Sequence, residues 1–543
     1  MTTDSKTMLS SQFYIEIGGQ PLTEPVASQL LSAEVEQHSL LPDTFTIRLS
    51  DPGLKLLDDS PFKLAETISL KAEPEQASKP VTLMCGEITA LEPQFDEFMI
   101  GELVIRGYDA SHKLYRTTQS KTYVNQKDSD IAATIAKAHG LKAEISSTST
   151  VYEHLFQHNQ SDLHFLMDRA WRIGYECFVQ DKTLFFRQPP QGTTALTLTW
   201  GDDLLSFYPR LTMAEQVNEV TVRGWDPAQQ KPIVGRAQVQ AGKLFPAIKE
   251  KVTDWLGKFG GGKLVITNQP VISQAEADLL AKARLNERSG AFVQAEGSAF
   301  RRPDIRAGQF VEVKGLGKRL SGRYLVTSAT HIYTPEGLTS QFSVRGARTG
   351  SFAEQIRGER PLPTQPGIVP AIVTNTNDPK NWGRVKVKFP WLSDADESTW
   401  ARLVSSGAGP DAGFFAVPDV GDEVFVAFEQ GDFNFPLVLG GVWNGRHKLP
   451  PTAHKASAKP QVRTWTSRSG HQITLFDDEK KIEVKSAGGL TITLDDNGKN
   501  IIVQADNEIQ LKARGNLSLE AGANLDIKAS GNVTVKGATI NLN

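Results

Sequence analysis

Residues 501–543 read IIVQADNEIQLKARGNLSLEAGANLDIKASGNVTVKGATINLN, and their large apolar residues recur with a period of eight. Each unit places two large residues two positions apart and a small residue after them, so that they share one face of an extended strand. The ten large positions are Ile501, Val503, Ile509, Leu511, Leu517, Leu519, Leu525, Ile527, Val533 and Val535. Asparagine and glycine between the units favour bends. The pattern therefore predicts one short strand and one bend per unit.

A unit of eight residues provides only one wall of a core, so the other walls must come from elsewhere. Three identical chains wound together would each supply one face of a prism, with the apolar stripe inward and no exposed strand edges. Burying two large aliphatic residues contributes roughly 3 to 6 kcal/mol per unit per chain, as an upper bound before chain entropy is subtracted. We therefore predict a homotrimeric needle with these apolar positions at its core.

Two other repeat structures fit this pattern less well. Calcium-binding nonapeptide repeats need paired glycines and an aspartate that recurs in every unit, and this repeat has neither, nor the right period. Amyloid-like stacking is disfavoured by the charged residues on the turns, which are Lys512, Glu520, Lys528 and Lys536.

The last unit, ATINLN, shifts its apolar residues by one position. This shift indicates a finished end of the needle. The residues predicted to form a docking face for another protein are Thr539, Ile540, Asn541, Leu542 and Asn543.

The composition indicates several folded domains and no overall attraction for polyanions. A chain of 543 residues exceeds the size of a single hydrophobic core. Its 59 basic and 62 acidic residues give a net charge of -3, so nucleic-acid binding would need a local cationic patch. Cys85 and Cys177 cannot make a disulfide framework, and we predict buried thiols. The start has no signal-peptide pattern, and no stretch approaches the roughly 18 apolar residues that span a bilayer.

The first half of the chain alternates as strands do, for example in TFTIRLS (44–50). Three stretches have helical spacing instead. They are DSDIAATIAKAHG (128–140), SDLHFLMDRAWRIG (161–174) and SQAEADLLAKARLNERSG (273–290). The first should begin at Ser129 or Asp130 and end at Gly140, and the second has Ser161 as N-cap and Gly174 as stop.

A weak internal echo connects two predicted strands, VIRGYD (104–109) and TVRGWD (221–226). Together with their strand-rich surroundings, the shared letters suggest two related barrels within residues 1–345, with a helical region at 122–180 between them. We expect the two strands to occupy equivalent positions if this interpretation is right.

Residues 368–446 contain five short strand-like segments separated by turn residues. Their number and length suit a small closed barrel of the oligonucleotide/oligosaccharide-binding (OB) type. The stretches at 346–367 and 447–464 are rich in proline or small polar residues and are predicted to be linkers. The needle is predicted to occupy residues 465–543.

Several residues invite a catalytic or ligand-binding interpretation, but each has a simpler one. His154, His158 and His164 are spaced suggestively for a metal, yet Asn159 to Asp162 reads as a helix start, which breaks their alignment. Gly260 to Gly262 lacks the Lys-Ser/Thr ending of a phosphate loop and reads as a turn.

The cations Arg384, Lys386 and Lys388, together with the nearby aromatic residues Trp382, Phe389 and Trp391, could bind a nucleic acid through its phosphates and bases. However, these cations alternate strictly with Val385, Val387 and Phe389, as in a half-buried strand. We therefore expect no nucleic-acid site. The acidic pairs at 477–478 and 495–496 read as solvated turns rather than a glycosidase dyad. No nucleophile elbow or ordered triad is found, so we predict no catalytic residue, metal or cofactor.

Longer phrases resemble a known family. NDPKNWGRVKVKFPWL (377–392) and VPDVGDEVFVAFEQGDFNFPLVLGGVWNG (417–445) resemble the barrel signature of the valine-glycine repeat (VgrG) spike proteins of contractile injection systems. GYDASHKLYR, SDIAATIAKAHGL, SDLHFLMDRAWRIGY and GRYLVTSATHIY are similar to the phage-tail hub domain that precedes this barrel in the family. The resemblance covers essentially the whole chain in the family's order.

The resemblance implies a mainly β fold with tail-hub β-barrels, a small α/β insertion, an OB-fold barrel and a C-terminal intertwined triple-stranded β-helix, or β-prism, in a homotrimer. The implied partners are hexameric inner-tube proteins, baseplate proteins, a tip protein of the proline-alanine-alanine-arginine repeat (PAAR) type at the C-terminus, and effector cargo. Some relatives carry a lysozyme domain between barrel and needle, for which this chain has no room, and others continue into a toxin. We therefore expect a non-enzymatic spike that is assembled in the bacterial cytoplasm and joins an extracellular or secreted particle. The alternatives are a spike with hidden peptidoglycan or polysaccharide hydrolase activity, and a receptor-binding tail fibre.

Overall fold

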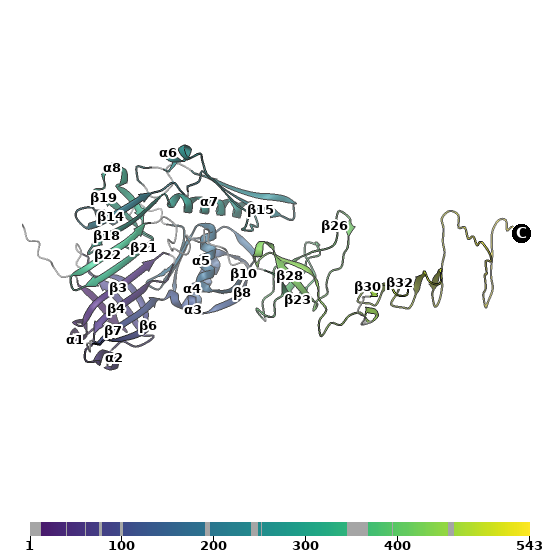
Figure 1. Cartoon of the computed structure of the whole chain (residues 1–543), viewed down its shortest axis with the longest axis horizontal. Helices are drawn as coiled ribbons and strands as arrows, with labels where there is room; N and C mark the ends of the chain where they lie inside the picture. Colours follow the sequence, from purple (N-terminus) through teal and green to yellow (C-terminus); the bar gives the residue numbers. More distant parts are fainter. Residues whose placement is uncertain are drawn as a thin grey trace, which may run out of the picture. The chain divides into compact units, whose positions relative to one another are not determined.

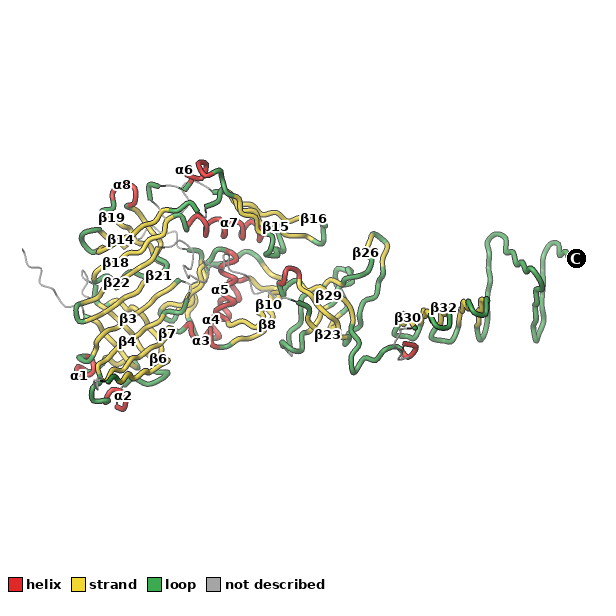
Figure 2. The backbone as a smooth tube through the Cα atoms, in the orientation of Figure 1, coloured by secondary structure: helices red, strands yellow, loops and turns green. Residues whose placement is uncertain are grey.

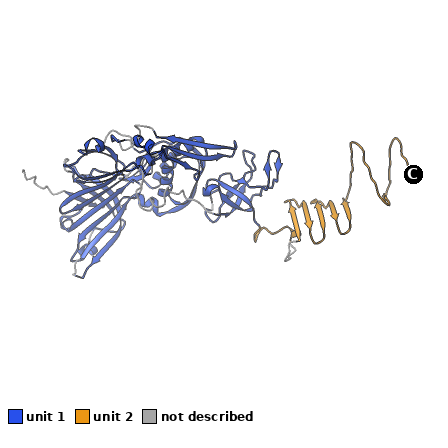
Figure 3. Ribbon diagram, turned by 45° about the horizontal axis from the view of Figure 1, so that its top comes forward, with its two compact units in different colours: residues 1–442 blue, residues 443–543 orange. Residues whose placement is uncertain are grey.

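The computed structural model describes most of the chain in two compact units, residues 1–442 and 443–543 (Figure 3). The described residues are 12–39, 41–59, 61–74, 79–97, 101–189, 196–214, 216–239, 248–250, 252–344, 367–393, 395–453 and 461–542. Most of the predicted linker at 346–367 and the middle of the one at 447–464 lie outside these residues. Figure 1 labels the helices and strands.

The first unit is built on an eleven-stranded sheet (Figure 2). Strands from both the N-terminal and the C-terminal half of the hub region (residues 12–344) contribute to this sheet. Its central pairing joins β3 to β21, with His38 opposite Ser328. Alternation explains why these segments are strands, because Phe45, Ile47 and Leu49 are buried along β4 while the residues between them are not. In spatial order the strands are β14 Leu204–Leu211, β18 Val293–Phe300, β22 Gly337–Val344, β21 Ser328–Thr334, β3 Leu30–His38, β4 Thr44–Ser50, β7 Gly101–Asp109, β6 Val81–Phe95, β5 Thr67–Ala72, β1 Phe13–Ile17 and β2 Gln20–Pro21.

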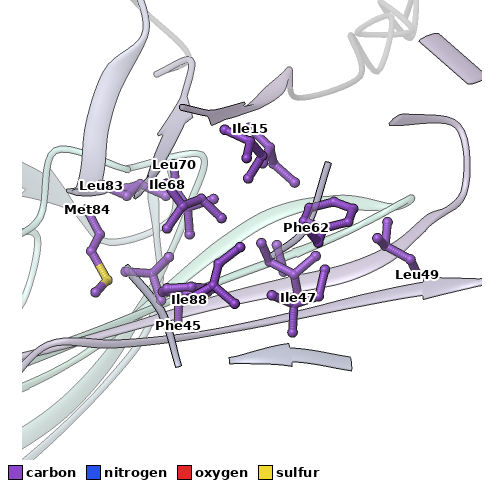
Figure 4. Close-up of a cluster of buried hydrophobic side chains, with 14 of the residues drawn as sticks. Ile15, Phe45, Ile47, Leu49, Phe62, Ile68, Leu70, Leu83, Met84 and Ile88 are labelled. Atoms are coloured by element: carbon purple, nitrogen blue, oxygen red, sulfur yellow. The ribbon is translucent and has the colours of Figure 1, made fainter. Parts of the chain in front are cut away.

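Two separate hydrophobic cores lie on this sheet, so the hub region consists of two half-barrels. One core gathers side chains from β1 to β7, including Ile47, Leu70 and Ile88 (Figure 4). The other gathers side chains from the second half, including Leu204, Tyr324 and Phe342. Two three-stranded sheets complete the second half, β13 Leu196–Thr199 with β19 Phe310–Lys314 and β20 Gly322–Leu325, and β15 Glu219–Asp226 with β16 Lys231–Gln238 and β17 Lys263–Ile266.

The expectation that the RGYD and RGWD strands are equivalent is wrong. The first echo lies in β7, between β4 and β6 of the large sheet, whereas the second lies in β15, the middle of a three-stranded sheet. The shared glycine has a local cause in each strand. A Cβ at Gly107 would approach the Phe45 ring to 2.4 Å, and one at Gly224 would approach the Val271 side chain to 2.5 Å. Crowding by a neighbouring side chain, rather than an equivalent position in the fold, explains why both strands have glycine here.

An inserted α/β domain (residues 110–187) follows β7. Its elements are α3 Ser111–Arg116, β8 Thr118–Lys127, α4 Asp128–Ala138, β9 Lys142–Ile145, β10 Val151–Ser161, α5 Asp162–Ile173, β11 Glu176–Gln180 and β12 Thr183–Arg187. The predicted caps of α5 are confirmed, because the Ser161 hydroxyl accepts the His164 N–H and Gly174 is left-handed at φ 74°. The first of the three predicted helices is α4. It begins at Asp128, one or two residues before the predicted start, because the Asp130 carboxylate accepts the Lys127 N–H.

The third predicted helix is α7, Gln274–Gly290, whose N-cap hydroxyl on Ser273 accepts the Glu276 N–H. The shorter helices of this unit are α1 Glu24–Ala27, α2 Lys55–Asp59, α6 Thr253–Leu256, η1 Gly257–Phe259 and α8 Gly317–Leu320. Gly260 and Gly261 follow η1 with φ of 80° and 66°, which confirms the turn predicted there.

The collar region (residues 367–442) is the predicted five-stranded barrel, with one strand from each predicted segment. Its order is β24 Lys386–Lys388, β23 Val369–Asn375, β28 Glu423–Phe428, β29 Pro436–Gly441 and β25 Arg402–Leu403. Val385, Val387 and Phe389 are buried, as the alternation predicts. A hairpin of β26 Ala408–Gly409 and β27 Ala412–Gly413 and a short turn of helix, η2 Glu429–Gly431, complete the region.

The second unit contains a five-stranded antiparallel sheet in simple sequence order. Its strands are β30 Val462–Thr466, β31 Gln472–Phe476, β32 Lys481–Lys485, β33 Thr491–Asp495 and β34 Asn500–Gln504, preceded by η3 Pro451–Ala453. Residues 505–542 form no strand in the single chain, although the eight-residue pattern predicts one per unit there.

Candidate functional site

The inserted domain holds the collar through the edge of β10 and β8. The Thr122 N–H donates to the Asp396 carboxylate at 2.9 Å, and the Phe156 N–H donates to the Asn434 side-chain oxygen at 2.8 Å. The His154 Nε2 lies 2.9 Å from the Glu397 carbonyl oxygen. We call these contacts the hub–collar joint.

A phenylalanine from the hub completes the collar's own core. Phe156 of β10 is buried and stacks on Phe433 of the collar, with ring centroids 5.0 Å apart. Phe433 in turn lies 4.3 Å from Phe428 and 4.9 Å from Phe389. The hub and the collar therefore share one aromatic cluster.

The histidines that invited a metal interpretation are parts of this joint or its surroundings. The His158 ring lies 4.2 Å from the Phe433 ring, and burial lowers the pKa of both His154 and His158. His164 lies apart on α5, edge-on to Tyr115 at 4.8 Å. Among the residues that the structure describes, no three acidic, cysteine or histidine side chains are grouped so that they could hold a metal ion.

Replacing Phe156 with alanine is expected to destabilise the joint by about 3 kcal/mol, because the substitution leaves a cavity in a shared aromatic core. Hydrogen exchange in β10, β28 and β29 should accelerate, while exchange in the large sheet stays as in the wild type. Phe415→Ala is the matched control, since Phe415 belongs to the same collar but is 80% exposed. Equal exchange rates in the two variants would show that Phe156 does not hold the joint.

A buried ionic network supports the joint from the hub side. The Arg172 Nε on α5 lies 2.8 Å from the Glu276 carboxylate on α7, and Arg172 also donates to the Pro270 carbonyl oxygen. The Tyr152 hydroxyl of β10 donates to the same carboxylate at 3.2 Å. Burial opposes ionisation, yet the neighbouring Arg172 and the Ile272 N–H hold the pKa of Glu276 below its usual value. The network therefore fixes β10, α5 and α7 against one another.

Two of the collar cations for which polyanion binding was considered and not expected have internal partners. The Arg384 guanidinium contacts the Asp378 carboxylate at 2.6 Å, and its hydrogen bonds hold the pKa of Asp378 well below the usual range. The Lys386 Nζ lies 3.4 Å from Glu397. Arg384 also lies between two indoles, 5.1 Å from the Trp382 ring and 5.8 Å from the Trp400 ring. These contacts stiffen the collar strand, as the half-buried-strand interpretation expects.

The two cysteines are free thiols. Cys177 is buried, which raises its thiol pKa to about 12 and confirms the prediction for that residue. Cys85 lies on β6 and is only half-buried, so the prediction of a buried thiol is wrong for this residue. Its sulfur lies 3.8 Å from the Ser69 hydroxyl.

The sheet of the second unit has one apolar face, which we call the needle face. Its strand register aligns Trp465, Ile473, Val484, Ile492 and Val503 in one row across five strands. A second row contains Leu475, Ile482, Leu494 and Ile501. These side chains are 40% to 70% exposed in the single chain. The opposite face carries Thr464, Thr474, Glu483 and Thr493 in register.

The positions predicted for the needle core and tip are exposed in the single chain. Ile501 and Val503 lie on the needle face, and the eight positions from Ile509 to Val535 follow it in the segment without strands. Ile540 and Leu542 of the predicted tip are also exposed, whereas Asn543 lies outside the described residues. The structure therefore leaves both predictions untested.

Sequence reasoning missed the joint and most of the needle face. The signal for Phe156 was its position beside Leu155, since two consecutive large apolar residues in an alternating strand indicate that both faces are buried. The signal for the needle face was the alternation in ITL, IEV and ITL at 473–475, 482–484 and 492–494, at a spacing of nine to ten rather than eight.

Two family models match parts of this chain. A family model described as the type VI secretion system/phage-baseplate injector OB domain matches residues 369–443. A second model, described as the Alg8 N-terminal domain, matches residues 65–334. In the described residues, no helix is both long and apolar enough to cross a membrane.

Curated relatives include spike proteins of Pseudomonas aeruginosa. The type VI secretion system spike protein VgrG1b is 24% identical over 438 residues, which cover 73% of this chain and 56% of the relative. VgrG1a is 27% identical over 215 residues, covering 36% of this chain and 33% of the relative. The actin cross-linking toxin VgrG1 of Vibrio cholerae is 35% identical over 102 residues, 18% of this chain and 9% of the toxin. The chain thus spans about half the length, or less, of the curated relatives it matches.

Solved structures share the fold at low sequence identity. The Escherichia coli c3393 protein, a component of the type VI secretion system described as similar to the T4 bacteriophage tail proteins gp27 and gp5, aligns with a TM-score of 0.51 and 16% identity over 79% of this chain and 99% of its own. A Francisella PdpA-VgrG complex aligns with a TM-score of 0.51 and 10% identity over 91% of this chain and 80% of its own.

The half-barrels, the baseplate OB domain and these relatives identify a contractile-injection spike fold. Within that class these findings support a VgrG-like spike, which confirms the resemblance read from the sequence.

Proposed function

We propose that this chain is the central spike of a contractile injection system, in which three copies pierce a target envelope. The hub regions would cap the inner tube, the collar regions would form a narrow neck, and the second units would wind into a needle. The role is mechanical and needs no catalytic residue of this chain.

The needle face carries this proposal. A sheet with one apolar face needs a second layer against it, and the described part of the second unit contains no other sheet and only the short η3. Fully burying a large aliphatic or aromatic side chain contributes about 1.5 to 3 kcal/mol, so leaving the needle face in water is costly. The same face on two further copies would supply the missing layer and close the assembly.

The hub–collar joint supports the same proposal in a different way. A piercing device has to transmit axial load without bending where its domains meet. Phe156 joins the core of the collar, and the Arg172–Glu276 pair locks the helices behind it. Both features make the joint stiff, which the proposed role requires.

The proposed partners follow from the two ends of the spike. A hexameric inner-tube ring and baseplate proteins would contact the hub, and a PAAR-type tip protein would sit on the residues Thr539 to Asn543. Effector cargo would travel on the tip or the needle. The complex would assemble in the bacterial cytoplasm before it leaves the cell.

The test is the solution mass of the intact chain, measured by size-exclusion chromatography with light scattering. A homotrimer has three times the 59.5 kDa mass of the chain. A chain cut before Trp465 should lose this assembly or bind less tightly, because it lacks the needle face. A monomeric intact chain at micromolar concentration would refute the proposed function.

A further inference from the structure

Two buried aspartates face each other where the large sheet meets the inserted domain. In the register of β4 and β7, Thr44 pairs with Tyr108, so Asp43 and Asp109 are the next opposing residues. The Asp109 N–H donates to the Asp43 carbonyl oxygen at 3.0 Å, which continues this pairing. Both residues are buried. Two like charges opposite each other on neighbouring strands destabilise a sheet, and burial makes the repulsion stronger.

The hydrogen bonds of this pair leave one oxygen without a donor. Asp43 Oδ1 accepts the His38 N–H at 3.0 Å, and Asp109 Oδ1 accepts the N–H and the hydroxyl of Ser111 at 3.1 and 2.5 Å. Asp109 Oδ2 is buried and has no hydrogen-bond partner among the described residues. An ionised carboxylate with a buried, unpaired oxygen is costly. A proton on the neighbouring carboxyl group would supply the missing donor.

The surrounding charges do not compensate two ionised aspartates. Arg306, from the loop before β19, is the cation that acts on Asp43, but it also lies 3.3 Å from Asp181 in the β11–β12 turn and donates to the Thr82 carbonyl oxygen of β6. His331 is fully buried beside Arg306, and burial lowers its pKa to about 4, so it is neutral. Arg306 therefore divides its charge between Asp43 and Asp181. Burial raises the pKa of Asp109 to about 7, and burial and the charge of Asp109 raise the pKa of Asp43 well above its usual value.

We propose that Asp43 and Asp109 share one proton at neutral pH, and that losing this proton at alkaline pH releases the start of the inserted domain from the large sheet. In this proposal the shared proton lies between the two carboxyl groups and supplies the donor that Asp109 Oδ2 lacks. Asp109 Oδ1 then keeps its two bonds to Ser111, the first residue of α3. When both groups ionise, their repulsion separates β4 from the β7–α3 connection.

The sign of the pH dependence follows from linkage. An acid whose pKa is higher in the folded than in the unfolded chain binds more protons when folded, so stability falls as the pH rises from the unfolded pKa through the folded pKa and then levels off. The pair titrates as a unit rather than as two separate groups. Opening that is coupled to the loss of one proton should become about tenfold more favourable per pH unit.

The first measurement is hydrogen exchange of the intact protein between pH 6 and pH 9, corrected for intrinsic exchange. In the wild type, protection of the α3 amides should fall by up to about tenfold per pH unit until the pair has lost its proton, and should then level off. In Asp43→Asn the side-chain amide donates permanently to Asp109 Oδ2, so this protection should not depend on pH. Asp51→Asn is the matched control, because Asp51 is also buried in this half-barrel but its carboxylate accepts the N–H groups of Leu56 and Leu57. This control should keep the wild-type pH dependence.

The second measurement is infrared difference spectroscopy. The difference spectrum of the wild type minus Asp43→Asn or Asp109→Asn, at pH 6 to 7, should show a carbonyl-stretch band of a protonated carboxylic acid that disappears above pH 9. The band of the buried Glu176, whose pKa burial also raises to about 7, should cancel in this difference. A difference spectrum without this band at pH 6, or an Asp43→Asn variant that keeps the pH-dependent loss of protection, would overturn the proposal. Neither result depends on whether the chain is trimeric.

Discussion

A chain carrying Ile492→Asp is expected to be monomeric at concentrations at which we expect the wild type to be trimeric. Ile492 lies in its row on the needle face between Val484 and Val503. In the proposed trimer three copies of this side chain would be buried near one another. Each would bring an ionised carboxylate into an apolar core without a partner, which costs several kcal/mol per chain. Light scattering would report a threefold fall in mass.

The matched control changes the other face of the same strand. Thr493→Lys places a charge on the next residue of β33, opposite Glu483, where an ion pair is favourable. This variant should remain trimeric. If Ile492→Asp also keeps the trimeric mass, the needle face is not the contact between chains. If both variants are monomeric, the sheet itself, rather than its apolar face, is what the substitutions disturb.

The second large effect is expected for Glu276→Gln, which removes a charge from the buried network behind the joint. Arg172 would keep its shape-matched neighbour but lose its counter-ion in a site where the side chains of both residues are at most 5% exposed. Breaking such a pair from one side costs about 3 to 5 kcal/mol, because the remaining charge stays buried. Thermal unfolding followed by tryptophan fluorescence should show a clearly lower transition for the first unit.

Two further variants separate charge from packing. Glu102→Gln removes a partner from the exposed Arg48–Glu102 pair at 2.7 Å and should change the transition little. The double variant Arg172→Met/Glu276→Leu replaces the buried pair with apolar side chains and should recover much of the loss. A single Glu276→Gln variant as stable as Glu102→Gln would show that the network does not hold the helices together.

Because the pKa of Glu276 is depressed, the contribution of this carboxylate to stability should also be lost as the pH falls through the pKa of Glu276 in the folded chain.

Local patterns predicted the elements of the fold well. The caps of α5 could be read from Ser161 and Gly174, because a hydroxyl acceptor and a left-handed glycine are local requirements. The collar strand could be read from the alternation of Val385, Val387 and Phe389, because one face of a barrel strand is buried. In both cases the physical cause lies within a few residues of the signal.

The contacts between distant parts of the chain could not be predicted in this way. Phe156 and Asn434 lie 278 positions apart, and each sequence neighbourhood specifies a strand or a turn but not what it faces. The Asp43–Asp109 pair depends on the register of β4 against β7, which no local pattern of charge reveals. The similarity between RGYD and RGWD was misleading for the opposite reason. Similar local crowding requires glycine at Gly107 and at Gly224, although the two residues lie in different sheets.

The order of strands in the second unit also bears on how the chains of the proposed trimer would find the correct alignment. Strands β30 to β34 pair only with their sequence neighbours, so each chain can form this sheet alone through short, fast loop closures. Residues 505–542 have no strand pairing within the chain, and their nearly identical units would allow a slip of eight residues at little cost. The preformed sheet has no such ambiguity, because Trp465 marks one corner of its apolar face. We expect winding to begin there and to proceed toward the C-terminus, with the sheet setting the stagger of all three chains.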